Sequence, residues 1–145
     1  MNKIFVTPFL KKNKHGEIVC EVKKNYFEYF QDLNFLCFSL FTRKKKIIRE
    51  IANISKGLIL SGGGNIYAVE KKKINSTRDD FEKDLIKEFL KRKKPIIAIC
   101  RGFQLVASIS KAKIVKVKNH VKKNHKIKII RKNKFINYNY LYTNS

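Results

Sequence analysis

A cysteine stands where an unbroken apolar run ends and a helical pattern begins. The run Ile96–Ile99 leads directly into Cys100, and Arg101 and Gly102 follow. A buried strand, a sharp turn that carries a reactive side chain and then a helix are typical of an elbow that presents a nucleophile at the end of a sheet strand. We therefore predict that Cys100 is a nucleophile. The alternative for a cysteine taken alone is a buried, inert core residue.

A second candidate for chemistry is the triple glycine Gly62–Gly64, which follows the apolar run 57–61. Glycines permit positive φ and leave main-chain N–H groups uncovered, so such a loop can bind an anion or an oxyanion. A flexible turn is the alternative. No Gly-Lys-Ser/Thr sequence closes the loop, which argues against a nucleotide phosphate loop. A thiolate nucleophile requires donors of this kind for the oxyanion that forms on its substrate.

These two groups are positioned by alternating strands and helices. Strands are predicted at 3–7, 36–41, 57–61 and 96–99, and helices at 26–33, 46–54, 77–94 and 103–109. Thr77 or Asp79 is the expected cap of the third helix, and Pro95 ends it. Repeated strand–helix units predict a parallel sheet covered on both faces, with ligands beyond the carboxyl ends of its strands. Cys100 and Gly62–Gly64 are both expected at such ends, facing one pocket.

The pattern changes after residue 110, where apolar and basic residues alternate. Residues 113–118 and 126–131 predict two strands with an exposed basic face, which form a β-hairpin around 119–124. Residues 137–142 form a polar and aromatic tail. Near the N-terminus, the polar residues 11–17, with Gly16 among them, are predicted to be a loop.

The chain has 145 residues and a formal net charge of +23, and 43% of its residues are hydrophobic. This length and composition predict one globular domain over residues 1–145. A strongly positive charge is typical of proteins that bind nucleic acid. The lysines, however, are spread in short runs and are not gathered with aromatic residues into a nucleic-acid module. We favour an A/T-rich coding sequence as the origin of the charge, and keep a nucleic-acid partner as the alternative.

The cysteines Cys20, Cys37 and Cys100 are odd in number and far apart, which predicts a reducing compartment and therefore the cytoplasm. No apolar run approaches the roughly 20 residues of a membrane span. The N-terminal apolar segment is interrupted by Pro8 and Lys11, unlike a signal peptide. No Cys-x-x-Cys or His/Cys cluster has the spacing of a zinc site, and we expect neither a metal nor a cofactor.

Three segments taken together carry a family resemblance. They are Leu60–Asn65 with its glycines, Arg78–Glu82, and Lys94–Gln104 with its Cys-Arg-Gly-x-Gln elbow. They resemble the class I glutamine amidotransferase superfamily, and within it the γ-glutamyl amide hydrolases related to γ-glutamyl-γ-aminobutyrate hydrolase. The similarity is continuous over about residues 57–109. It implies a flavodoxin-like three-layer α/β sandwich with a mainly parallel sheet, in which Arg78–Glu82 positions the loop and a helix.

The resemblance also implies roles for individual residues. Cys100 would attack the side-chain amide carbonyl of a small-molecule γ-glutamyl substrate, and water would release glutamate from the resulting thioester. The main-chain N–H groups of Gly63 and Arg101 would hold the oxyanion. Gln104 and Gly64 would bind the glutamyl portion.

The family's triad is completed by a histidine and an acidic residue nearer the C-terminus. The segment that should carry the histidine, Phe135–Tyr140, has none, and no acidic residue follows Glu88. His120 and His125 match histidines upstream of the catalytic one, so neither is assigned as the base. The sequence therefore predicts a family member with an incomplete C-terminal part, either cut short or a non-catalytic relative that retains the pocket. Its missing elements would leave a sheet edge open and favour homo-oligomers.

Overall fold

The computed structural model describes residues 1–115, 124–130 and 140–144. The chain divides into two compact units, Met1–Ile114 and Val115–Ser145. The single domain over 1–145 stays a prediction. The first unit contains the strands β1 (Asn2–Val6), β2 (Phe9–Lys12), β3 (Ile18–Glu21), β4 (Phe35–Phe38), β5 (Gly57–Leu60) and β6 (Ile96–Ala98), and the helices α1 (Lys24–Asp32), α2 (Lys45–Ile54), α3 (Lys73–Lys91) and α4 (Arg101–Ile109).

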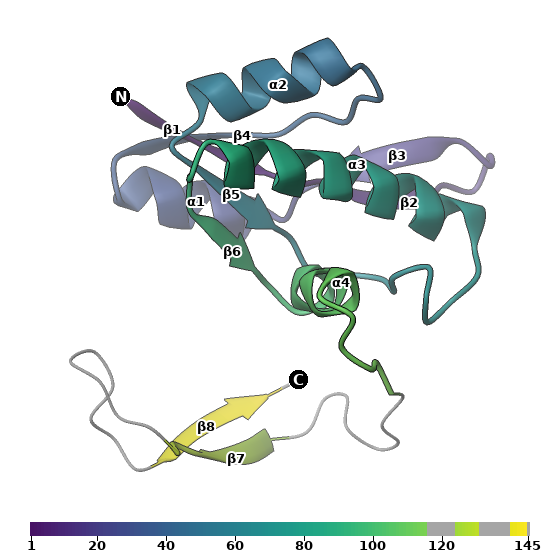
Figure 1. Ribbon diagram of the computed structural model, residues 1–145, viewed down its shortest axis with the longest axis vertical. Helices are drawn as coiled ribbons and strands as arrows, with labels where there is room; N and C mark the ends of the chain where they lie inside the picture. Colours follow the sequence, from purple (N-terminus) through teal and green to yellow (C-terminus); the bar gives the residue numbers. More distant parts are fainter. Residues whose placement is uncertain (116–123, 131–139, 145) are drawn as a thin grey trace. The chain divides into compact units, whose positions relative to one another are not determined.

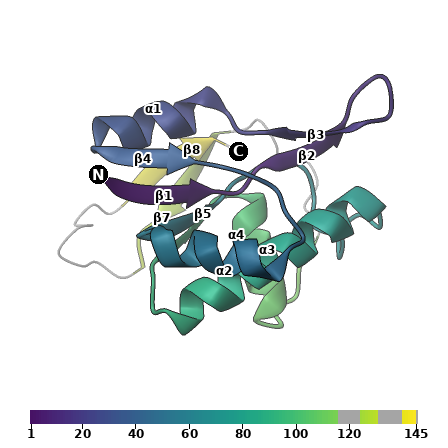
Figure 2. The ribbon, with the colours of Figure 1, turned by 90° about the horizontal axis from the view of Figure 1, so that it is seen from above.

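The centre of this unit is a four-stranded sheet in the order β4-β1-β5-β6, and every pair in it is parallel (Figure 1). Successive side chains of a strand point to opposite faces. Phe5 and Leu58 therefore pack with α2 and α3, while Ile4 and Ile59 pack with Phe30 of α1. Figure 2 shows α1 on one side of the sheet and α2 and α3 on the other. This arrangement confirms the predicted flavodoxin-like α/β sandwich.

An antiparallel hairpin, β2–β3, was not predicted. The predicted loop 11–17 covers its turn and also takes in residues of β2. The turn is organised by Asn13, whose side-chain oxygen accepts hydrogen bonds from the N–H groups of His15 and Glu17 at 2.9 and 3.0 Å. Gly16 lies in the left-handed region with φ 81°. These strands are only four residues long, Phe-Leu-Lys-Lys and Ile-Val-Cys-Glu, so neither shows the clean apolar alternation that indicates a strand.

Helix α3 begins at Lys73, several residues before the predicted caps, so the capping prediction was wrong. The Thr77 hydroxyl instead donates to the carbonyl oxygen of Lys73 one turn earlier, at 3.0 Å. The Asp79 carboxylate accepts the N–H of Tyr67 at 2.9 Å and pairs with Arg101. Both polar side chains are therefore used inside the helix. In the described ranges, no helix is both long enough and apolar enough to cross a membrane.

The second unit contains β7 (Asn124–Lys128) and β8 (Tyr140–Asn144), which pair in antiparallel fashion. A strand at 126–131 was predicted, and β7 covers its first residues. The predicted partner, 113–118, is not the one that the structure shows: β7 pairs with the segment expected to be a tail. Residues 113–115 form no strand, and 116–123, with His120, lie outside the described residues. A strand with alternating polarity indicates its faces but not its partner.

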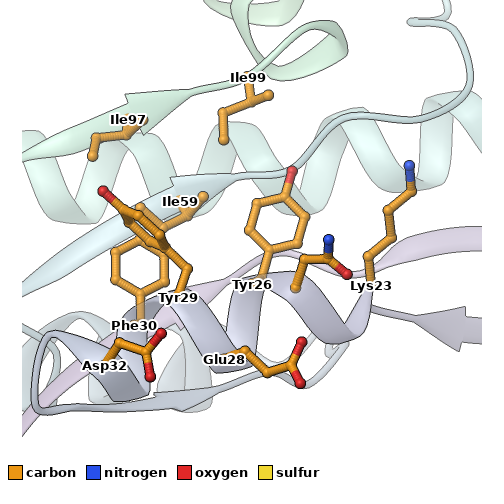
Figure 3. Close-up of a pocket in the computed structure, with 10 residues that line it drawn as sticks. Lys23, Tyr26, Glu28, Tyr29, Phe30, Asp32, Ile59, Ile97 and Ile99 are labelled. Atoms are coloured by element: carbon orange, nitrogen blue, oxygen red, sulfur yellow. The ribbon is translucent and has the colours of Figure 1, made fainter.

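An apolar surface is open on the α1 side of the sheet. A cavity of about 740 Å³ lies there between α1 and the outer strand β6, and Figure 3 shows Tyr29 and Phe30 facing Ile97 and Ile99. Ile97 is 53% exposed and Ile99 is 40% exposed. Exposed apolar patches of this kind often mark contacts with other molecules. This surface is in line with the expected self-association, which stays a prediction.

Candidate active site

Cys100 lies between β6 and α4 in a backbone conformation that residues with a side chain rarely adopt, with φ 50° and ψ −105°. The pairing of β6 with β5 continues up to the preceding residue, because the N–H of Ile99 donates to the carbonyl oxygen of Leu60 at 3.0 Å. Helix α4 begins at the next residue, Arg101. Such conformations persist only where the surroundings enforce them, and they cluster at active sites. Cys100 therefore has the backbone geometry of the predicted elbow, and its thiol is exposed.

Gly102 explains how closely α4 approaches the sheet. A Cβ atom at this position would lie 2.6 Å from both the Cβ atom and the carbonyl oxygen of Leu60. Leu60 ends β5 and is fully buried, so it has no room to move away. The missing side chain at Gly102 therefore allows the start of α4 to pack against the end of β5, which places Cys100 beside the loop that follows β5.

Replacing Gly102 by alanine should lower the free energy of unfolding by about 1–3 kcal/mol or more, since the added methyl group has no space. Urea denaturation followed by circular dichroism measures the change. Ser108→Ala, near the end of the same helix, is the matched control and should stay within about 0.5 kcal/mol of the parent. Equal stability of Gly102→Ala and the parent would contradict the close packing of α4 on β5.

The glycine loop lies directly beside the cysteine. A Cβ atom at Gly62 would be 3.4 Å from the Cβ atom of Cys100. Gly63 and Gly64 have φ values of 90° and 72°, which glycine adopts without strain. The N–H of Gly62 donates to the hydroxyl of Tyr26 at 3.4 Å. Among the described residues, the N–H groups of Gly63 and Gly64 donate no hydrogen bond, so they are available to a ligand.

The glycine loop and the cysteine line one cavity of about 830 Å³. Its walls are formed by Phe9, Cys20, Glu21, Val22, Lys23, Tyr26, Ser61, Gly62, Gly63, Gly64, Ile99 and Cys100. The expectation that the two strand ends face one pocket is confirmed. Gln104 is not among the lining residues, and its side-chain oxygen is buried without a hydrogen-bond partner in the part of the chain that the structure describes.

Arg78 holds the glycine loop from the protein side. Its Nη2 donates to the carbonyl oxygen of Ser61 at 2.8 Å, and its Nη1 donates to that of Gly63 at 2.9 Å. Arg78 also donates from Nη2 to the Ser61 hydroxyl at 2.9 Å. Because Arg78 binds these carbonyl oxygens, it fixes the loop from the side opposite to the N–H groups of Gly63 and Gly64, which have no acceptor within the described ranges. The expectation that Arg78–Glu82 positions the loop is confirmed by these contacts.

Behind the cavity lies a buried ionic cluster of Arg78, Asp79, Glu82 and Arg101, each at most 4% exposed. Glu82 accepts hydrogen bonds from Arg78 Nε at 2.9 Å and from the Thr7 hydroxyl at 2.8 Å, and it also pairs with Arg101. Arg101 pairs with Asp79 as well. Two positive and two negative charges therefore balance where an unpaired charge would be costly. The cluster ties α3 and α4 to the residue that follows β1.

The side chain of Arg101 in this cluster was not predicted, because the family resemblance implies a role only for its main-chain N–H. The spacing of Arg78 and Glu82, one helical turn apart on α3, was the available signal for a buried pair. Burial raises the pKa of the Asp79 carboxyl, although the Tyr67 N–H and Arg101 act in the opposite direction. The two partners of this carboxyl lie on two other segments of the chain, Tyr67 in the loop before α3 and Arg101 at the start of α4.

Thiol alkylation should distinguish the three cysteines of the native protein. Cys20 and Cys100 are exposed, whereas Cys37 is buried in β4. Burial also raises the pKa of the Cys37 thiol, and it raises that of Cys20. Since the thiolate is the reactive form, iodoacetamide should modify Cys37 far more slowly than the other two. Peptide mass spectrometry over time measures the order, and fast labelling of Cys37 before unfolding would contradict the buried position of its strand.

Comparison with known proteins gives a family and two relatives. The model of the peptidase C26 family matches residues 7–140. A γ-glutamyl-CDP-amidate hydrolase of Campylobacter jejuni is 34% identical over 84 residues, which cover 58% of this chain and 41% of that protein. A glutamine amidotransferase-like protein of Lactococcus lactis is 31% identical over 96 residues, which cover 61% of this chain and 41% of that protein. The matched part of the chain thus spans about two fifths of each relative.

Proposed function

We propose that this chain, which belongs to the peptidase C26 family of class I glutamine amidotransferase-like domains, hydrolyses a γ-glutamyl amide bond. The names of the two relatives support this activity class. The observation that carries the proposal is the Cys100 elbow, which shares a cavity with the N–H groups of Gly63 and Gly64, and these donate no hydrogen bond to any described residue. A thiol and main-chain donors at one site are what acyl transfer through a thioester requires.

In the proposed reaction, the Cys100 thiolate attacks the amide carbonyl carbon of the substrate. The N–H groups of Gly63 and Arg101 stabilise the tetrahedral oxyanion, and Arg101 is suited to this because the first N–H groups of a helix lack intrahelical acceptors. The C–N bond then breaks, the amine leaves with a proton, and a γ-glutamyl thioester remains. Water attacks this thioester, the C–S bond breaks, and glutamate and the free thiol result. By the family resemblance a histidine moves these protons, and we assign no residue to that role.

Binding of the glutamyl portion is proposed for Gly64 and Gln104. Gly64 lines the Cys100 cavity with an N–H that is free among the described residues. Gln104 follows Cys100 by one helical turn, and its N–H donates to the Cys100 carbonyl oxygen at 3.0 Å. We also propose a cytoplasmic location, because a free exposed thiol such as Cys100 persists in a reducing compartment.

The proposal is tested by trapping the thioester. The protein is incubated with glutamine or γ-glutamyl-γ-aminobutyrate, quenched in acid and examined by intact-protein and peptide mass spectrometry. We expect a γ-glutamyl adduct on the peptide that contains Cys100, together with free glutamate in solution. Glutamine binding with neither adduct nor glutamate would instead favour the non-catalytic relative that retains the pocket. If neither glutamine binding nor an adduct is detected, the result contradicts both the proposed hydrolysis and the non-catalytic alternative that retains the pocket.

A further inference from the structure

A second cavity adjoins the one that contains Cys100. It has a volume of about 530 Å³ and lies between β2 and the start of α3. Phe9 and Gly64 line both cavities. The Phe9 ring lies close to Gly64, where an added Cβ atom would be 2.9 Å from the ring Cε2 atom, and the Arg78 guanidinium lies 5.6 Å from the ring centroid. The two cavities therefore meet at Phe9 and Gly64, which is the side on which a ligand bound at Cys100 would reach the second space.

The second cavity is strongly basic. Four lysines line it, Lys11 and Lys12 from β2 and Lys72 and Lys73 from the start of α3, together with one acidic residue, Glu70. Its floor is apolar and includes Leu10, which is 4% exposed. Lysines on two separate elements that face a common space can contact one anionic group from both sides, and lysine binds phosphate as a point charge.

Ion pairs neutralise only part of this charge. Lys72 pairs with Glu70 at 2.6 Å, and Lys11 pairs with Glu21 at 2.6 Å. Hydrogen bonds from Lys72 and two asparagines lower the pKa of the Glu70 carboxyl, so this residue stays ionised and bound to Lys72. Lys12 and Lys73 have no ion-pair partner among the described residues. The cavity therefore has two surplus positive charges from two different elements.

We propose that this lysine-lined cavity binds a phosphate group on the amine half of the γ-glutamyl amide, the half that leaves from Cys100. A phosphate ester carries about −1.5 to −2 charges near pH 7, which matches Lys12 and Lys73, the two lysines of this cavity that pair with no described carboxylate, better than a single carboxylate does. The inference rests on the proposed hydrolysis in one respect: it takes the ligand to be the amine that hydrolysis releases. The cavity, its charge and its contact with Gly64 are independent of any turnover.

Binding is tested first, in the Cys100→Ala protein, where no thioester can form. Isothermal titration with inorganic diphosphate is compared between the double variants Lys12→Ala/Lys73→Ala and Lys87→Ala/Lys91→Ala. The second pair removes the same charge from exposed positions at the other end of α3. We expect Kd to rise about tenfold or more in the first variant and to change little in the second. Equal losses in both variants, or no binding to the parent, would overturn the proposal.

Substrate preference is tested second, in the chain with Cys100 intact. γ-Glutamyl-phosphoethanolamine and γ-glutamyl-ethanolamine differ only in the phosphate group. We expect kcat/KM to favour the phosphorylated amide, Lys12→Ala/Lys73→Ala to remove this preference, and Lys87→Ala/Lys91→Ala to keep it. Equal kcat/KM for the two amides would overturn the assignment of the cavity to the leaving amine. If neither amide is cleaved, the proposed hydrolysis fails, while the diphosphate titration still decides whether the anion site exists.

Discussion

Replacing Cys100 by alanine should lower kcat/KM for glutamate release from a γ-glutamyl amide by about 10⁴-fold or more. The reason is that the sulfur forms the covalent bond of the proposed thioester, and no neighbouring group can replace it. Cys20 lines the same cavity but lies on β3, outside the elbow next to Gly62. Glutamate is measured by mass spectrometry at several substrate concentrations, so that kcat and KM are separated.

Cys37→Ala is the matched control for this experiment. It also removes a thiol, but one that is buried in β4 and does not line the cavity. We expect the control to retain most of the activity of the parent. Circular dichroism of both variants checks that the fold is kept. Undiminished glutamate release by Cys100→Ala would show that the reaction does not pass through this cysteine.

Removal of the Glu82 carboxylate should cause the largest loss of stability, about 3–5 kcal/mol in the free energy of unfolding for Glu82→Ala. Glu82 is fully buried and has three partners, Arg78, Arg101 and Thr7. Without it, two buried guanidinium groups would share the single carboxylate of Asp79. Chemical denaturation measures the change, and thermal denaturation provides a second estimate.

Two variants make this prediction specific. Asp80→Ala removes an exposed carboxylate from the same helix, where its only described ion pair, with Lys83, spans 3.8 Å. Such a surface pair contributes about 0–1 kcal/mol, so this variant should be nearly as stable as the parent. Glu82→Gln keeps the size and an acceptor oxygen, and should fall between the two. A Glu82→Ala protein as stable as Asp80→Ala would refute the role of the buried cluster.

Local patterns were sufficient to predict most of the first unit. The alternation of apolar runs with helical spacing predicted β1, β4, β5 and β6 and the four helices between and after them. Turn residues and helix periodicity depend on neighbours a few positions away, so sequence alone reports them. The β2–β3 hairpin was missed because its strands are only four residues long and carry little apolar alternation. The start of α3 was misplaced because Thr77 and Asp79, typical capping residues, are used inside the helix.

The elbow at Cys100 and the glycine loop were determined by the sequence itself, because a glycine run and a cysteine directly after apolar strands specify where each lies along the chain. Only the tertiary structure decided what surrounds them. Thr7 and Glu82 are 75 positions apart, yet they share a hydrogen bond in the cluster that supports the loop. Phe9 of the unpredicted hairpin lines both cavities. Such contacts depend on which elements pack together in space, and no local spacing encodes that choice.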